Sequence, residues 1–160
     1  MPAEDELIFR QVRTERFADA GIKDFVLVDG PGLALRHAPA LTKHFGLGFA
    51  RQLAKTLSKN RLFYFTLSDG AVVTIGTLAI GFCNFYTVEP DAVVIGSVWT
   101  GDAFRGKGLA TRSIRAAVNG MIARNCSIFY IDTQASNTAM LRSIENLGFG
   151  APIGTFSSLS

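Results

Sequence analysis

The stretch VVIGSVWTGDAFRGKGLA (Val93–Ala110) decides the fold, because it passes from a strand pattern through a glycine-rich turn into a helix. Val and Ile favour strands. The apolar residues after the turn recur at helical spacing: Ala110, Ile114, Ala117 and Met121. Glycines let a backbone approach a ligand closely, and the amides at a helix start carry partial positive charge. Such a turn can bind phosphate, although the same pattern can also be a tight structural turn.

Basic residues gather at this turn. Residues 101–115 hold four basic residues against Asp102 alone, an excess that equals the net charge of +3 of the whole chain. Arg105 and Lys107 lie beside the glycines, where their charges can pair with a pyrophosphate. The rest of the chain is electrically balanced, whereas nucleic-acid binding calls for a broad basic surface. We therefore expect a phosphorylated small molecule as partner and no nucleic acid.

Strand and helix patterns continue on both sides of the turn. A helix is expected over Gly108–Arg124, a strand over Cys126–Thr133, and a last helix that Ser136 or Asn137 caps and Gly148 ends. The upstream patterns are a strand at Leu7–Val12, one helix at Thr42–Ser58, and two or three antiparallel strands across Arg61–Leu67 and Ala71–Val88. We expect one α+β domain over residues 1–160. Antiparallel N-terminal strands and a C-terminal parallel strand–helix–strand–helix unit would form its mixed sheet.

Composition narrows the class of protein. The chain has 160 residues, of which 48% are hydrophobic, which suits one globular domain with a real core. The two cysteines, Cys83 and Cys126, lie far apart and indicate neither a metal site nor a disulfide framework. The acidic residues Glu4–Glu6 near the start do not fit a secretory signal peptide. The segment Ala71–Val88 is uncharged and nearly long enough to span a membrane, but the polar residues within it argue against a membrane helix. We expect a cytoplasmic protein without metal or membrane partner.

The turn resembles the signature of the GNAT superfamily of acetyl-CoA-dependent N-acetyltransferases, which is Arg or Gln, two residues, Gly, one residue, then Gly or Ala. The segment RGKGLA (Arg105–Ala110) fills every fixed position. A second family feature is an Asn followed eleven residues later by Gly-Phe, which here are Asn137 and Gly148-Phe149. The resemblance covers roughly Ala92–Phe149, and the first ninety residues are similar only in their pattern of elements.

The resemblance implies a GNAT-like fold with acetyl-CoA as the acyl donor. It implies that the backbone of Val98–Thr100 aligns the pantetheine arm like an added strand. The amides of Arg105–Ala110 would hold the pyrophosphate, and Asn137 would contact the arm from the other side. The implied cofactor-binding residues are Val98, Trp99, Thr100, Arg105, Gly106, Lys107, Gly108, Leu109, Ala110 and Asn137. Asn137 also fits the role of a helix cap.

The residues for proton transfer are not marked by the sequence. In many relatives a Tyr or a Ser acts as the general acid that protonates the leaving thiolate. This chain has Ile144 and Met140 at those two positions. The candidate bases are acids at strand ends: Glu89, Asp91 and Asp132. Deprotonation through water is an alternative. His37 and His44 fit surface or loop positions as well as catalysis, and Cys83 fits packing in a strand.

Three functions follow as hypotheses. The first is an N-acetyltransferase that moves an acetyl group from acetyl-CoA directly to a primary amine of a small molecule or a peptide. An amino sugar is one of the small molecules considered as acceptor, and the enzyme would act as a monomer or homodimer. The second is a non-catalytic CoA-binding sensor or interaction domain, because both usual acids are missing. The third is transfer of a longer acyl chain along a tunnel lined by Phe45, Phe63, Phe82 and Phe85.

Overall fold

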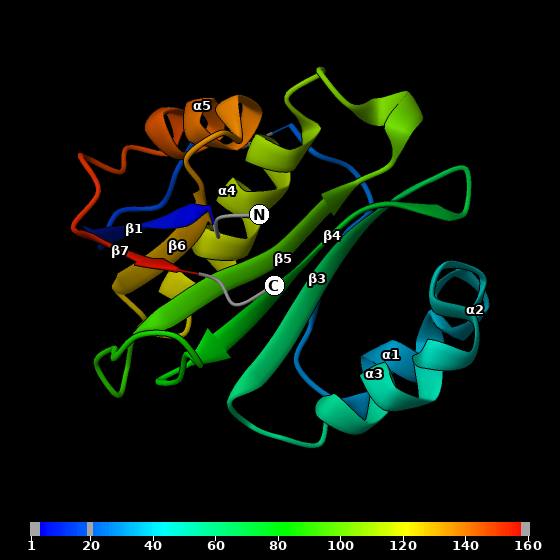
Figure 1. The fold of residues 1–160 in the computed structure, drawn as a ribbon. Coiled ribbons are helices and arrows are strands. Elements are labelled where there is room, and N and C mark those ends of the chain that lie inside the picture. The colour runs from blue at the N-terminus through cyan, green and yellow to red at the C-terminus, as the bar shows by residue number, and fades with distance from the viewer. Residues whose placement is uncertain (1–3, 19–20, 158–160) are drawn as a thin grey trace.

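The computed structural model describes residues 4–18 and 21–157, which build one seven-stranded sheet in the order β2-β3-β4-β5-β6-β1-β7 (Figure 1). The strands are β1 (Asp5–Val12), β2 (Phe25–Val28), β3 (Arg61–Ser68), β4 (Ala71–Ile80), β5 (Val93–Thr100), β6 (Ile128–Gln134) and β7 (Gly154–Ser157). The α-helices are α1 (Pro31–Arg36), α2 (Ala38–Phe45), α3 (Phe49–Lys55), α4 (Leu109–Ile122) and α5 (Thr138–Asn146). The fold also contains two short 3-10 helices, η1 (Gly46–Gly48) and η2 (Asp102–Phe104).

Strand directions confirm the expected mixed sheet. Every neighbouring pair is antiparallel except β5 and β6, which are parallel and joined through α4. The glycine-rich turn therefore stands at the carboxyl end of β5, between the two parallel strands. A connection of this kind puts its helix on one face of the sheet.

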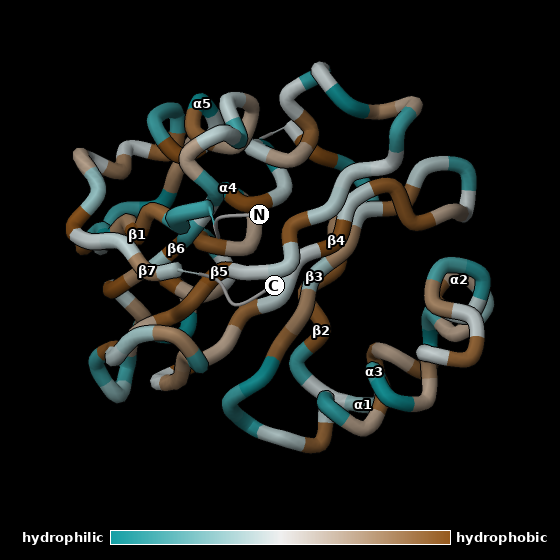
Figure 2. Tube along the Cα trace, in the orientation of Figure 1, coloured by the Kyte–Doolittle hydropathy of each residue, from teal (hydrophilic) through white to brown (hydrophobic). Residues whose placement is uncertain are grey.

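Apolar side chains pack on both faces of the sheet. Figure 2 shows the hydrophobic residues along the strands and the helices that cover them. On one face α4 and α5 pack against the central strands through residues such as Ile114, Met121 and Ile144. The opposite face is covered by two separate parts: α1, α2 and α3 lie over β2–β4, whereas the loop after β4 lies over β5, β6 and β1. The second face is thus divided, which leaves room between its two covers.

The helix expected over Thr42–Ser58 is two helices. Gly46 adopts a φ of 56° at the carboxyl end of α2, a left-handed conformation that glycine tolerates and that ends an α-helix. The chain then passes through η1 into α3. Equal spacing of apolar residues on both sides of the break concealed it in the sequence.

The uncharged segment Ala71–Val88 forms one strand followed by a loop. β4 ends at Ile80, and Gly81 turns the chain with a φ of 73° so closely that a Cβ there would overlap the carbonyl of Pro90. The following residues fold over the face of β5, β6 and β1 instead of extending the sheet, so the possible third strand is not formed. No helix within the described residues is long and apolar enough to cross a membrane.

Candidate functional site

The sheet opens between β5 and β6. The two strands pair only over Val93–Ile95, opposite Phe129–Ile131. Ser97 then adopts a φ of 51°, next to a register irregularity between β5 and β4. From Gly96 onward β5 pairs with β4 alone. The free edge of β5 therefore faces an opening in the middle of the sheet.

A cavity of about 640 Å³ lies between this free edge, the glycine-rich turn and α5. Its lining includes most of the cofactor-binding residues that the sequence predicts: Val98, Trp99, Thr100, Arg105, Gly106, Gly108, Leu109, Ala110 and Asn137. Lys107 does not line it. The lining also includes Thr111, Arg142 and Ser143, which the sequence analysis did not select. The fold thus collects two distant segments around one space.

The turn presents backbone N–H groups without protein partners. Gly106 and Gly108 have φ values of 76° and 72°, and a Cβ on either would meet no atom within 4 Å. In the described part of the chain no backbone hydrogen bond engages the N–H groups of residues 106–111, and Arg112 N is the first to donate, to Gly108 O at 3.1 Å. The first N–H groups of a helix have no partner inside it. They border the cavity and can bind an anion.

Two arginines hold the shape of the turn. Arg105 donates from Nε to the Thr100 carbonyl at 3.1 Å and forms an ion pair with Asp102 at 3.3 Å. Arg112 donates to the Lys107 carbonyl at 3.4 Å. Part of the basic cluster therefore stabilises the turn itself. Arg142, which comes from α5, adds a cation to the cavity that the local cluster in the sequence did not reveal.

Asn137 and two hydroxyls connect α5 to the cavity. Asn137 accepts a hydrogen bond from Met140 N at 3.2 Å, so it caps α5 as expected while it also lines the cavity. Thr111 in the first turn of α4 donates to Ser143 in α5 at 2.8 Å. The contact between Thr111 and Ser143 holds the start of α4 against the second half of α5.

Asp132 lies at the opening between the strands. The opening contains a cavity of about 240 Å³ whose lining includes Ser97, Val98 and two acids, Glu6 and Asp132. Tyr86 Oη donates to Asp132 at 2.7 Å. Burial raises the pKa of Asp132, and burial together with the charge of Asp132 raises the pKa of Glu6. Glu6 was missed in the sequence, because only the pairing of β1 with β6 brings it beside Asp132.

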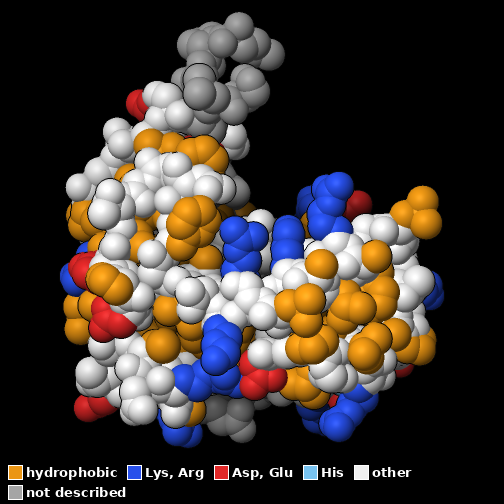
Figure 3. Space-filling model, turned by 90° about the horizontal axis from the view of Figure 1, so that it is seen from below, with side chains coloured by type: hydrophobic (Ala, Val, Ile, Leu, Met, Phe, Trp, Pro, Cys, Tyr) orange, Lys and Arg blue, Asp and Glu red, His pale blue; other side chains and the backbone are white. Residues whose placement is uncertain are grey.

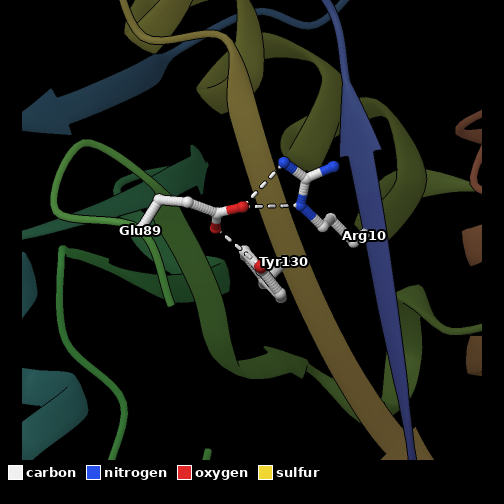
Figure 4. A network of polar contacts seen from close by, with 3 residues as sticks. All are labelled: Arg10, Glu89 and Tyr130. Carbon is white, nitrogen blue, oxygen red and sulfur yellow. Dashed lines mark hydrogen bonds and ion pairs between the residues drawn. The ribbon is translucent and has the colours of Figure 1, made fainter. Parts of the chain in front are cut away.

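The other two candidate bases lie at the opposite end of β5. Glu89 accepts hydrogen bonds from Arg10 at 2.7 Å and from Tyr130 Oη at 2.6 Å, as Figure 4 shows. The Tyr130 hydroxyl and the Arg10 guanidinium hold the pKa of Glu89 below its usual value. Asp91 is exposed just before β5. Neither lines the cavities described above.

A groove on the divided face approaches the same opening from the other side. It has a volume of about 200 Å³ between α3 and the loop after β4. Its lining is Gln52, Lys55, Thr56, Arg61, Leu62, Phe63, Thr77, Leu78, Ala79, Phe82, Asn84 and Ser97. The groove shares Ser97 with the opening, and the opening shares Val98, Asn137 and Met140 with the large cavity. The groove, the opening and the large cavity are therefore neighbours, and the opening connects the other two through the sheet.

The histidines and Cys83 lie outside these linings. The His44 ring lies 4.7 Å from the ring of Trp99, and burial lowers the pKa of His44. His37 packs edge-on to Phe65 at 5.3 Å. Cys83 lies in the loop after β4 and packs against the apolar residues beneath that loop. Across the described residues there is no cluster of three or more His, Cys, Asp or Glu side chains suited to a metal ion.

The four phenylalanines proposed as a tunnel are dispersed. Phe45 packs against Phe63 with ring centres 6.5 Å apart, and Phe85 stacks on Phe156 at 5.0 Å. Phe63 and Phe82 line the groove, whereas Phe45 and Phe85 do not. These contacts give no continuous aromatic lining from the four residues.

Comparison with known proteins adds to this geometry. A model of the acetyltransferase (GNAT) family matches residues 39–149. An acetyltransferase of the GNAT family from Novosphingobium aromaticivorans has a similar structure at 22% identity and a TM-score of 0.64. The match covers 98% of this chain and 66% of that protein, so this chain spans just under two thirds of that relative.

Aminoglycoside N-acetyltransferase AAC(6')-Iy, solved in complex with CoA, is similar at 18% identity and a TM-score of 0.63, with 86% of this chain and 98% of that chain covered. The same enzyme with the bisubstrate analogue CoA-S-monomethyl-acetylneamine gives 16% identity, a TM-score of 0.64, and coverage of 86% and 99%. At these identities the likeness establishes the fold. A comparison with curated proteins finds no match.

Proposed function

The chain belongs to the GNAT acetyltransferase family, and on that premise we propose that it transfers an acetyl group from acetyl-CoA directly to a primary amine of a small molecule or peptide. The observation that carries the proposal is the row of unpartnered N–H groups at residues 106–111, which borders a cavity of about 640 Å³ beside the free edge of β5. A cavity of this size lies within the range of ligand sites.

The turn fits the pyrophosphate of acetyl-CoA. The space around Gly106 and Gly108 is open, and a side chain at either position would fill the place where an anion meets the backbone amides. The partial positive charge at the start of α4 and the cation of Arg142 in the lining favour the same anion. Arg105 holds the turn and contributes its charge from there.

The free edge of β5 fits the pantetheine arm. Val98, Trp99 and Thr100 have no neighbouring strand on the β6 side, and the arm contains amides that can pair with a strand edge. The reactive thioester would then lie at the opening, near Asn137 and Asp132. This order follows from the turn being at one end of the cavity and the opening at the other.

We assign the general base to Asp132. The attacking amine must be neutral, and a carboxylate whose pKa is raised accepts a proton better than an ordinary one. The amine nitrogen forms its bond to the acetyl carbon, the bond from that carbon to sulfur breaks, and the amine proton moves to Asp132. CoA leaves as the thiolate and takes its proton from solvent. Tyr86 stays protonated, because burial and Asp132 raise its pKa, and it holds the carboxylate in position.

A substitution in the turn tests the donor site. Gly108→Glu places a side chain and a negative charge among the amides, so we expect CoA affinity to fall by at least about 100-fold in a calorimetric titration. Gly70→Glu is the matched control. Gly70 has a φ of 77° and open space around it in the β3–β4 hairpin, so it carries the same backbone strain far from the cavity. Equal CoA affinity of wild type and Gly108→Glu would refute the placement.

A non-catalytic CoA-binding domain is the second candidate. It is favoured by the buried Ile144 and by Met140, which occupy the positions of the acids seen in relatives. Thiol release from acetyl-CoA with a panel of amines separates the two functions. Acceptor-dependent release supports the enzyme, and tight CoA binding without release supports the sensor.

We also infer one domain over residues 1–160 and a cytoplasmic location. The domain inference is supported by the three apolar clusters, which all pack on one continuous sheet. The location is supported by the two free cysteines, a state typical of a reducing compartment.

A further inference from the structure

We propose that the groove between α3 and the loop after β4 binds an anionic end, a carboxylate or a phosphate, of the amine that is acetylated. This rests on the acetyl transfer proposed above and adds the chemical class of the acceptor. Figure 3 shows this side of the molecule, where Lys and Arg side chains gather along a hollow flanked by hydrophobic side chains.

The groove is placed to hold an acceptor during transfer. Ser97 belongs to the lining of both the groove and the opening, and Asp132 lines that opening. The left-handed backbone at Ser97 is the point where β5 changes its pairing. A molecule whose anionic end occupies the groove therefore points its amine end toward Asp132. The cavity of about 640 Å³, which we call the donor cavity, lies on the far side of the sheet.

The charge of the groove is positive. Lys55 and Arg61 are the charged residues of its lining, which contains no Asp or Glu. Neither cation forms an ion pair with any residue in the described ranges. The Arg61 guanidinium lies 5.7 Å from the centre of the Phe82 ring, a contact that keeps its charge at the groove. Two unpaired cations on one small concave surface attract an anion.

The size and the remaining lining set the kind of anion. About 200 Å³ corresponds to roughly six or seven water molecules, which suits a phosphate or a carboxylate with a short apolar part. Gln52 and Asn84 offer amide donors to the anion, and the 47% exposed Phe82 offers an apolar wall. A polycationic acceptor such as an aminoglycoside would meet repulsion here, so we expect acceptors unlike those of the aminoglycoside enzymes of similar fold.

Matched pairs of acceptors test the charge preference. Glucosamine 6-phosphate against glucosamine isolates the phosphate, and phenylalanine against phenylalaninamide isolates the carboxylate. We expect the anionic member of at least one pair to have a kcat/KM about tenfold higher, mainly through KM, as charge-assisted hydrogen bonds allow. The two pairs distinguish phosphate from carboxylate. Neamine, a polyamine, should be the poorest acceptor.

Charge reversal in the groove assigns the effect to its residues. Lys55→Glu and Arg61→Glu should remove the preference for the anionic member and raise the rate with neamine, while the KM for acetyl-CoA stays unchanged. Lys59→Glu is the matched control, because Lys59 is exposed between α3 and β3 but does not line the groove. Equal kcat/KM for both members of each pair in wild type, or equal effects of all three reversals, overturns the proposal.

Calorimetric titration separates this proposal from the proposed function. Glucosamine 6-phosphate and phenylalanine are titrated into the protein without acetyl-CoA, and CoA is titrated separately. If the wild-type protein neither binds CoA nor transfers acetyl groups, the proposed acetyltransferase function is refuted. The groove proposal is still supported in that case if the protein binds the anions and if Lys55→Glu weakens this binding while Lys59→Glu leaves it unchanged. CoA binding and transfer without any anion binding overturn the groove alone.

Discussion

Single residues in this protein owe their chemistry to neighbours that lie far away in the sequence. Asp132 is half-buried beside Glu6 and accepts a hydrogen bond from Tyr86, a residue of the loop after β4. Glu89, an equally plausible acid by position, is held by Arg10 and Tyr130 and has a lowered pKa. The surroundings therefore raise the pKa of one carboxyl group and lower the pKa of another, and only the first suits the base proposed above.

Asp132→Asn tests this difference through pH. A base acts only when deprotonated, so kcat/KM should rise with pH through the raised pKa of Asp132, and this acidic limb should disappear with large loss of activity in Asp132→Asn. Stability should move the other way. A carboxyl whose pKa is higher in the folded state stabilises the fold only below its ordinary pKa and destabilises it once pH exceeds the raised value.

At pH 7 the unfolding midpoint of Asp132→Asn should therefore equal or exceed that of wild type. Glu89→Gln serves as the comparison, because Glu89 has a lowered pKa and contributes stability at neutral pH that substitution removes. An unchanged pH profile of kcat/KM in Asp132→Asn contradicts the assignment of the base.

At the scale of elements, the start of α4 depends on how the helix is joined to the sheet. Ser113 donates to the Leu109 carbonyl at 2.8 Å, so its one proton is used there. Thr74 and Thr66 must then donate to Ser113, at 2.9 and 3.2 Å. This buried group of hydroxyls ties the first turns of α4 to β3 and β4. It thereby sets the position of the N–H groups that border the cavity.

Ser113→Ala should lower the free energy of unfolding by about 1–3 kcal/mol, because two buried hydroxyls lose their acceptor. Weaker CoA binding should accompany this loss, since the turn is then less firmly placed. Ser157→Ala is the control, because Ser157 is exposed and, within the described residues, its hydroxyl makes one hydrogen bond, to Asp5. We expect its effect to stay within about 0.5 kcal/mol in urea unfolding. Equal losses for both variants would show that the hydroxyl group has no special role.

In the whole molecule, the opening between β5 and β6 connects the two faces of one sheet. The donor cavity lies on the face that α4 and α5 cover, and the groove lies on the divided face. In the reaction proposed above, the donor and the acceptor therefore enter from opposite sides and meet where the strands part. A closed sheet with the same helices would keep the two spaces separate.

CoA binding should stabilise the whole domain, because the cavity joins β5, α4 and α5 and exists only in the folded state. At 100 times its dissociation constant CoA should add about 2.7 kcal/mol to the free energy of unfolding. Thermal unfolding with increasing CoA measures this, and the midpoint should rise with the logarithm of its concentration. The rise should vanish in Gly108→Glu and persist in Gly70→Glu. A midpoint that ignores CoA in wild type contradicts a site built by these elements.

Local patterns were enough to predict the parts of the fold that local physics controls. The strand–turn–helix of residues 93–110, the cap at Asn137 and the mixed sheet were confirmed, because strand propensity, helical periodicity and glycine conformations act within a few residues. The break at Gly46 and the loop after Ile80 were not predicted, since apolar spacing continues across both. Only the tertiary structure decided the opening at Ser97, the position of Glu6 near Asp132, and the basic groove. Those depend on which distant strands become neighbours and where they part, and no spacing along one chain specifies that.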